Sequence, residues 1–135
     1  MKRFKTEDYV KMENPRPGES YRPEILTAEH GAKDLGGMFG LLPPGTQVPY
    51  HYHNKRESVI MIISGQGVEI MDGEKIPVST GDVFFIPAGV KHTTVNTSDT
   101  DLRYLEFFTQ PPVGSDFVAV TAESIPTNER LTNDG

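Results

Sequence analysis

The sequence predicts an all-β domain, a sandwich or a barrel, and three observations support this fold class. Short apolar runs follow one another closely from residue 25 onward. Gly or Pro stands at nearly every junction between these runs, drawn from 13 Gly and 11 Pro residues in a chain of 135. No window of about eleven residues has a convincing helical period. Closely spaced strands separated by such turn residues are typical of sandwiches and barrels.

The individual strands are predicted from the apolar runs and from the turns that end them. The run that ends at Leu42 is followed by two prolines and Gly45, and the run that ends at Ile63 is followed by Gly65. The Asp72-Gly73 pair favours a tight type I′ hairpin turn. We therefore expect strands at residues 37–42, 58–63, 68–71, 76–78, 83–86, 90–95 and 102–108, with 117–120 as a further candidate.

The chain has the length of a single domain, with room for one buried core. Residues 1–24 are polar and rich in proline, so we expect an N-terminal arm there. Residues 25–126 form the predicted β-barrel domain, and the polar residues 127–135 form a predicted flexible tail.

Composition and charge exclude several classes of partner. The net charge is −6, which argues against nucleic acid and against an anionic membrane surface. The chain has no cysteine, so His, Asp or Glu must hold any transition metal. We find neither a secretory signal nor an apolar segment of ~20 residues, and we expect a cytoplasmic protein.

Three of the four histidines stand at strand-like positions. His51 and His53 project from the same face of a strand, about 7 Å apart, so that both rings can approach one ion. Glu57 would lie ~13 Å beyond His53 on a straight strand, so the chain must turn within residues 54–56 to bring it back. His92 would arrive from a later strand. The alternative is that the two neighbouring histidines are ordinary polar residues on a solvated strand.

Two motifs in this sequence resemble those of the cupin superfamily. Residues 45–57 (GTQVPYHYHNKRE) match the first motif, which is a Gly, five residues, His-x-His, three or four residues, and then Glu. Residues 81–96 (GDVFFIPAGVKHTTVN) match the second motif at every defined position. The resemblance covers roughly residues 25 to 120 and implies a small single-domain cupin. Its fold would be a double-stranded β-helix, or jelly-roll barrel, with one metal ion bound by His51, His53, Glu57 and His92.

The sequence departs from the family pattern at one position. The family places a Gly seven residues after the Glu, whereas Ser64 stands there and Gly65 follows. We expect a β-bulge to take up the extra residue and to keep Glu57 facing the metal. The alternative is a regular strand in which Ser58 faces inward and the fourth ligand is lost.

The resemblance implies a metal-dependent enzyme acting on a small molecule, as a dioxygenase, decarboxylase, isomerase or lyase. The ligand types leave the divalent ion unresolved among Fe, Mn, Ni, Co, Cu and Zn. Four protein ligands would leave two open positions, where a substrate with adjacent oxygen atoms could chelate. A non-catalytic module that binds a small molecule in the same pocket is a second hypothesis, and a metal-free sugar epimerase is a third.

Glu69, Tyr104 and Arg103 are the candidate catalytic residues. Glu69 would act as a general base if it faces the pocket, although its apolar neighbours also fit a core with Glu69 in water. An inward Arg103 would bind an anionic substrate, and an inward Tyr104 would donate a proton or a hydrogen bond. Alternation along the strand means that these two are not expected to point in together, and each also fits an ordinary role, Arg103 in solvent and Tyr104 at the edge of the core.

The strand at 58–63 is apolar on both faces. We expect Ile60 and Ile62 to lie on the outer face and to be covered by a second subunit, which predicts a homodimer. Lys55 and Arg56 are expected to be exposed in the turn after His53.

Overall fold

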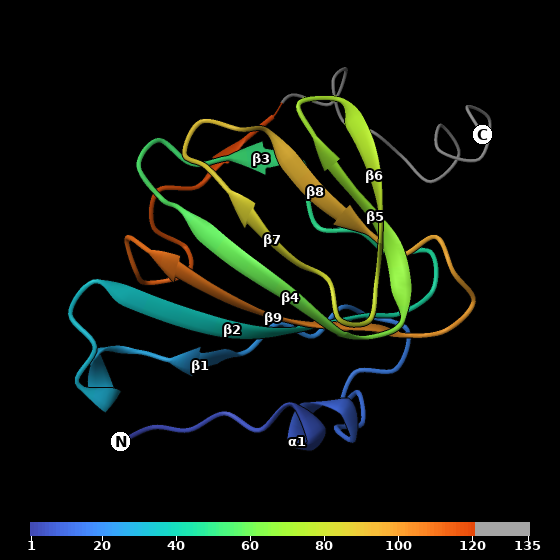
Figure 1. Cartoon of the computed structure of the whole chain (residues 1–135), viewed down its shortest axis with the longest axis horizontal. Helices are drawn as coiled ribbons and strands as arrows, with labels where there is room; N and C mark the ends of the chain where they lie inside the picture. Colours follow the sequence, from blue (N-terminus) through green and yellow to red (C-terminus); the bar gives the residue numbers. More distant parts are fainter. Residues whose placement is uncertain (121–135) are drawn as a thin grey trace.

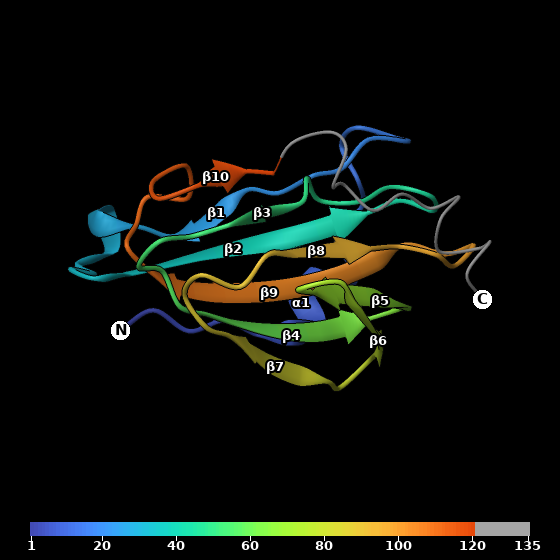
Figure 2. The same ribbon diagram turned by 90° about the horizontal axis from the view of Figure 1, so that it is seen from above.

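The computed structural model describes residues 1–120 and consists mainly of two facing five-stranded sheets, both antiparallel (Figures 1 and 2). One sheet has the order β1-β2-β9-β4-β7, and the other has the order β10-β3-β8-β5-β6. The strands are β1 (Glu24–Leu26), β2 (Leu35–Leu42), β3 (His51–Tyr52), β4 (Ser58–Ser64), β5 (Gln66–Met71), β6 (Glu74–Ser79), β7 (Val83–Ile86), β8 (His92–Val95), β9 (Leu102–Thr109) and β10 (Val118–Ala119). The predicted all-β class, a double-stranded β-helix, is confirmed.

The predicted strands are all present, with bounds that differ by at most two residues from those expected. Asp72 and Gly73 both have positive φ, 49° and 83°, as the type I′ turn between β5 and β6 requires. The helices are short: α1 spans Thr6–Val10 and the 3₁₀ helix η1 spans Ala28–His30. No helix within residues 1–120 has the length and apolar character needed to cross a bilayer. The predicted tail, 127–135, and the end of the predicted barrel domain lie outside the described residues.

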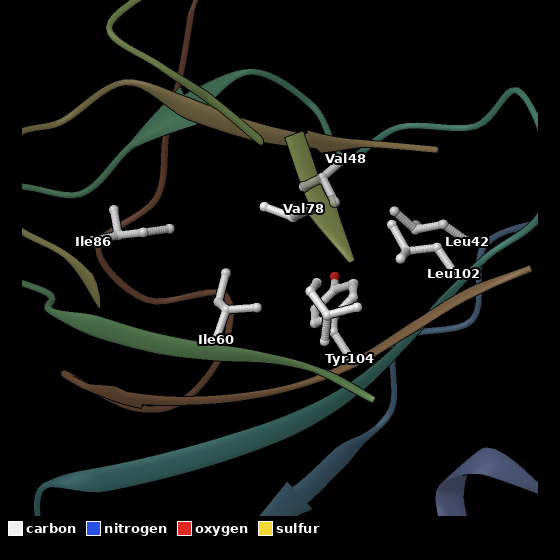
Figure 3. Packing of buried hydrophobic residues seen from close by; sticks show 8 residues of the cluster. Leu42, Val48, Ile60, Val78, Ile86, Leu102 and Tyr104 are labelled. Carbon is white, nitrogen blue, oxygen red and sulfur yellow. The ribbon is translucent and has the colours of Figure 1, made fainter. Parts of the chain in front are cut away.

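Aliphatic side chains from both sheets fill much of the space between them (Figure 3). Leu42 at the end of β2 lies opposite Leu102 at the start of β9, and both are fully buried. The complete cluster comprises Leu42, Val48, Ile60, Ile62, Val78, Ile86, Leu102 and Tyr104. This end of the barrel is therefore a packed core.

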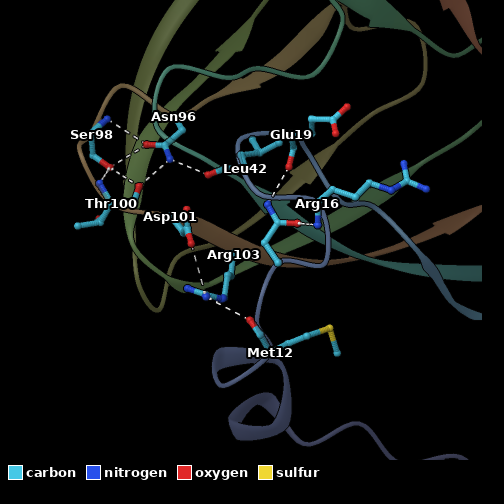
Figure 4. A network of polar contacts seen from close by, with 10 residues as sticks. Met12, Arg16, Glu19, Leu42, Asn96, Ser98, Thr100, Asp101 and Arg103 are labelled. Carbon is cyan, nitrogen blue, oxygen red and sulfur yellow. Dashed lines mark hydrogen bonds and ion pairs between the residues drawn. The ribbon is translucent and has the colours of Figure 1, made fainter.

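Asn96, directly after β8, closes the same end through a network of polar contacts (Figure 4). Its amide nitrogen donates to the carbonyl oxygens of Leu42 and Thr100, both at 2.7 Å. Its side-chain oxygen accepts from the backbone N–H and the hydroxyl of Ser98, at 3.0 and 2.7 Å. The side chain is buried and uses both its donor and acceptor groups, which is the arrangement that a structural residue needs.

The N-terminal arm covers the outer face of the first sheet. Tyr9 and Met12 pack against a second buried cluster of Phe39, Leu41, Ile63 and Leu105, with Met61 at its margin. The prediction that Ile60 and Ile62 face outward is wrong, because the register of β4 turns both into the inner core. The outward residues of β4 are Met61 and Ile63, and the N-terminal arm of the same chain packs against them. The homodimer therefore stays a prediction, and the apolar faces of β4 no longer support it.

Candidate metal centre

His51, His53 and His92 converge inside the barrel from two neighbouring strands. His51 on β3 pairs directly with His92 on β8, and His53 lies two residues farther along, on the same face as His51. The ring centroids are 4.2 Å apart for His51 and His92 and 4.8 Å apart for His51 and His53. The ligand atoms all lie within 4.8 Å of one another, close to the ~4 Å between opposite ligands on one ion with bonds of ~2.1 Å.

Backbone carbonyl groups fix the tautomer of each histidine. The Nδ1 atoms of His51, His53 and His92 lie 2.5, 2.6 and 2.9 Å from the carbonyl oxygens of Pro49, Asp116 and Val90. A carbonyl oxygen can only accept, so each Nδ1 must carry the proton. Each Nε2 then keeps its lone pair, the state in which imidazole binds a metal.

Burial keeps the three imidazoles neutral. Desolvation, followed by the charge of His92, lowers the pKa of His51 to about 3. Desolvation and the charge of His53 lower the pKa of His92 to about 4, against the effect of its hydrogen bond to Val90. The pKa of His53 is also lowered, mainly by burial. At neutral pH no proton has to leave these rings before a cation binds.

Asp116 holds the turn that carries His53. Its carboxylate accepts the backbone N–H groups of Asn54, Lys55 and Arg56 at 2.6–2.9 Å. Its own carbonyl oxygen accepts the Nδ1 proton of His53. These N–H groups lower the pKa of Asp116 to about 2. One residue therefore fixes both the turn and the orientation of a candidate ligand.

Arg56 ties the same turn to the loop between β9 and β10. The prediction that Arg56 is exposed is wrong, because its side chain is 3% exposed. The guanidinium stacks over the Phe108 ring and donates to four carbonyl groups, that of Thr109 at the end of β9 and those of Gln110, Pro112 and Val113 in the loop. The loop ends at Phe117, whose ring stacks on His51 at a centroid distance of 4.6 Å.

Glu57 does not join the three histidines in the structure. It is exposed at the start of β4, whereas Ser58 is buried and points into the barrel. A register shift does occur in β4, but it lies between Ile62 and Ser64, after the inward positions Ser58, Ile60 and Ile62. The bulge comes too late in the strand to turn Glu57 inward, so the geometry is that of the alternative register with Ser58.

Glu69 lies inside the barrel with a side chain that is only 1% exposed. Its Oε1 accepts from the hydroxyl of Thr94 at 2.6 Å, and its Oε2 has no hydrogen-bond partner among the described residues. Burial raises the pKa of this carboxyl well above its ordinary value, and the charge of Glu106 adds to the effect. Burial therefore favours the uncharged, protonated form of this carboxyl, and a strongly shifted carboxyl inside a barrel is a candidate functional group.

Tyr104 points inward and Arg103 points outward, as alternation requires. The Arg103 guanidinium donates to the carbonyl oxygen of Met12 and pairs with Asp101 at 3.7 Å on the outer face (Figure 4). Arg103 is therefore not a residue of the barrel interior. The expected guanidinium comes instead from the N-terminal arm, where Arg22 donates through Nε to the Tyr104 hydroxyl at 3.2 Å.

Arg22 and Glu106 are functional candidates that sequence reasoning missed. Glu106 is buried on β9, and burial raises the pKa of its carboxyl while the charge of Arg22 opposes that rise. The positive charge of Arg22 also contributes to the lowered pKa values of His51 and His92, after burial. Arg22 therefore lies within electrostatic reach of the histidines. No local pattern in the polar arm indicates a role for Arg22. The inward position of Glu106, in contrast, follows from that of Tyr104, which lies two residues earlier on the same strand.

The comparisons with known proteins agree with this fold. The family model described as a cupin domain matches residues 38–108. An oxalate-binding protein of Thermotoga maritima is 39% identical over 64 residues, which cover 47% of this chain and 53% of that protein. The chain spans about half the length of the curated relatives it matches.

Two solved structures show the same architecture. A predicted oxalate decarboxylase from Thermotoga maritima aligns with a TM-score of 0.65 and 30% identity, over 70% of this chain and 83% of that one. A protein with a double-stranded β-helix domain from Klebsiella pneumoniae aligns with a TM-score of 0.71 and 20% identity, over 90% of this chain and 99% of that one. The second likeness concerns the fold alone.

Proposed function

Because the chain belongs to the cupin family, we propose that it is a metal-dependent enzyme acting on a small, anionic, oxygen-bearing metabolite. The observation that carries the proposal is the convergence of three buried, neutral imidazoles, each with its Nε2 lone pair free of a proton. His51, His53 and His92 would hold one divalent ion. Glu57, the fourth ligand in the sequence-based prediction, is left out of this set.

Three neutral ligands change what the centre can bind. Without a carboxylate ligand, a divalent ion held there would keep its full charge of +2, and a six-coordinate ion would have three positions free. The all-nitrogen donor set favours Fe, Ni, Cu or Zn and weakens the case for Mn. The ion would supply Lewis-acid chemistry, or activate dioxygen, toward a substrate with adjacent oxygen atoms.

Arg22 is the proposed anchor for the negative charge of the substrate. Its guanidinium is oriented by the Tyr104 hydroxyl and acts electrostatically on two of the histidines. A planar guanidinium binds a carboxylate through two parallel hydrogen bonds. The printed descriptions of two relatives, an oxalate-binding protein and a predicted oxalate decarboxylase, also name a small carboxylate.

Glu69 is the proposed acid–base residue, and Tyr104 is the proposed positioning residue for Arg22. Desolvation raises the pKa of the Glu69 carboxyl well above its ordinary value, which favours the protonated form that can donate to a developing negative charge. The Tyr104 ring packs directly against the backbone of Gly40, where the Cβ of any other residue would overlap the ring. The glycine is therefore needed for this position of Tyr104. Decarboxylase, dioxygenase, isomerase and lyase chemistry all remain compatible with these groups.

The test is reconstitution with single metals. The protein is stripped with a chelator, reloaded with Fe, Mn, Ni, Co, Cu or Zn in turn, and assayed against small mono- and dicarboxylates. We expect turnover that disappears with the chelator and returns with one of these metals. Binding of a carboxylate without turnover by any metal form would favour the second candidate, a non-catalytic binding module, which the oxalate-binding relative supports.

Two arginines provide a matched control for the anion site. Arg22→Gln should raise KM for a carboxylate substrate by about tenfold or more, the loss expected when a charged hydrogen bond of ~1.5 kcal/mol or more is removed. Arg103→Gln, on the outer face of β9, should leave KM unchanged. Equal effects of the two substitutions would remove Arg22 from the proposed site.

A further inference from the structure

β6 and β7 lie at the same edge of the molecule (Figure 2), and residues of both strands line a cavity there. β6 is the last strand of one sheet and β7 is the last strand of the other, so each has one backbone edge without a neighbouring strand among the described residues. The cavity measures about 250 Å³ and is lined by residues that include Ile76 on β6, and Val83 and Phe84 on β7. None of the described residues that line it is a histidine.

Glu69 on β5 lines this cavity on the side of the barrel interior. It lies directly opposite Ile76 in the β5–β6 ladder, so the two side chains share one face of the sheet. Its Oε2 is buried and lacks a hydrogen-bond partner among the described residues. A buried polar atom that is left without a partner is costly, and it marks a position where another molecule can complete the hydrogen bonding.

We propose that the gap between β6 and β7 is an entrance to the barrel interior, through which small uncharged molecules and solvent protons reach Glu69. The lining beside Glu69 is mainly apolar, apart from Asp82 near the β6–β7 turn, so the entrance admits uncharged solutes in preference to anions. If Glu69 exchanges its proton with solvent through this entrance, the proton does not have to pass a substrate bound near the histidines. Glu69 also belongs to the proposed function, but access to it through this entrance does not require a bound metal.

An apolar carbodiimide provides a chemical probe of this route. The O–H of a protonated carboxyl adds across one C=N bond, so that oxygen bonds to the central carbon and the proton goes to nitrogen. The acyl group then migrates to nitrogen, and the stable N-acylurea retains every atom of the reagent. The groups around Glu69 are the hydroxyl of Thr94, the carboxyl of Glu106 and the phenol of Tyr104, with Asp82 in the lining of the same cavity. None of them is a cation, and burial raises the pKa of Glu69, so the reactive, protonated form of its carboxyl is favoured.

The experiment treats the metal-free protein with diisopropylcarbodiimide at neutral pH and maps the adducts by peptide mass spectrometry. We expect an adduct on Glu69 in the folded protein, formed faster than the one on Glu106, and complete loss of the Glu69 adduct in Glu69→Gln. Ile76→Trp, which narrows the entrance, should slow the labelling of Glu69 about tenfold, equivalent to ~1.4 kcal/mol of added barrier. Val59→Trp, an exposed position on the outer face of β4, is the matched control and should leave the rate unchanged.

Glu106 is the internal reference, since it is buried on β9 and does not line this cavity. Its labelling rate should be the same in the Ile76→Trp and Val59→Trp proteins. An unlabelled Glu69 in the folded protein, or a Glu69 rate that Ile76→Trp does not change, would overturn the proposal. Neither result depends on metal binding, so failure here is distinguishable from failure of the proposed function.

Discussion

Strand β8 runs between the two ends of the barrel, and the buried polar residues at its two ends differ in one respect. His92 begins the strand at the metal centre, and Asn96 follows its last residue at the packed end. Both side chains are at most 3% exposed. Asn96 uses both its donor and acceptor groups in four hydrogen bonds to its neighbours. His92 uses Nδ1 in this way and directs its other nitrogen toward two more imidazoles.

The difference separates a structural residue from a functional one. A buried polar group whose capacity is filled by its own chain stabilises the fold. A buried imidazole whose second nitrogen accepts no hydrogen bond has lost its contact with water and gained no partner in the protein. When several such groups lie together, binding of a ligand can restore the lost interaction. The following predictions test whether this distinction holds at the two ends.

The largest effect is expected at the histidines. His92→Ala should reduce metal affinity by more than about 100-fold, beyond the range found for residues that only support a ligand. Glu57→Ala should leave affinity unchanged, because Glu57 is exposed outside the cluster. Competition titration with a chelator measures both values. A marked loss of affinity in Glu57→Ala would restore the register in which that carboxylate is a ligand.

Asn96→Ala should destabilise the protein by ~2–4 kcal/mol, because the buried carbonyl group of Leu42 and the carbonyl group of Thr100 lose their donor and the Ser98 groups lose their acceptor. Denaturant unfolding measures the loss, and metal affinity of the folded variant should remain at the wild-type value. A loss of metal affinity in this variant would mean that the two ends are not independent.

Asp116→Asn should weaken metal binding about tenfold, the lower end of the range for groups that orient a ligating histidine. The amide cannot accept all three backbone N–H groups of residues 54–56 as the carboxylate does. Asp82→Asn is the matched control, since Asp82 also accepts a backbone N–H in a turn, that of Ser79. The ¹⁵N chemical shifts of His53 should change in Asp116→Asn only; unchanged shifts there would contradict a positioning role.

The remaining effect is a pH dependence of the stability of the metal-free protein. The pKa of His51 is lowered from 6.5 to about 3, chiefly by burial, whereas the unfolded chain takes up this proton near 6.5. The folded state therefore loses free energy of unfolding as the pH falls from about 6.5 toward 3, and His51 has no such effect above that window. Bound zinc should move the loss to lower pH. Equal unfolding free energies at pH 7 and pH 5 without metal would show that the rings are not desolvated.

The sequence by itself determined the strands, their turns and the three histidines. These features depend on local alternation, on turn residues such as the Asp72-Gly73 pair, and on a motif spacing that places His51 and His53 on one face. The second motif likewise identified His92. No tertiary contact was needed to predict them.

Only the tertiary structure decided between Glu57 and Ser58 and brought Arg22 to Tyr104. Moving the strand register by a single residue exchanges the inner and outer faces, and the bulge that controls the register of β4 lies after Ile62, where long-range pairing with β9 places it. Arg22 and Tyr104 are 82 residues apart in the chain, and Arg56 meets its partners more than 50 residues away. Contacts over such separations leave no periodic signal in the sequence, because they depend on how the arm and the loops pack onto the finished barrel.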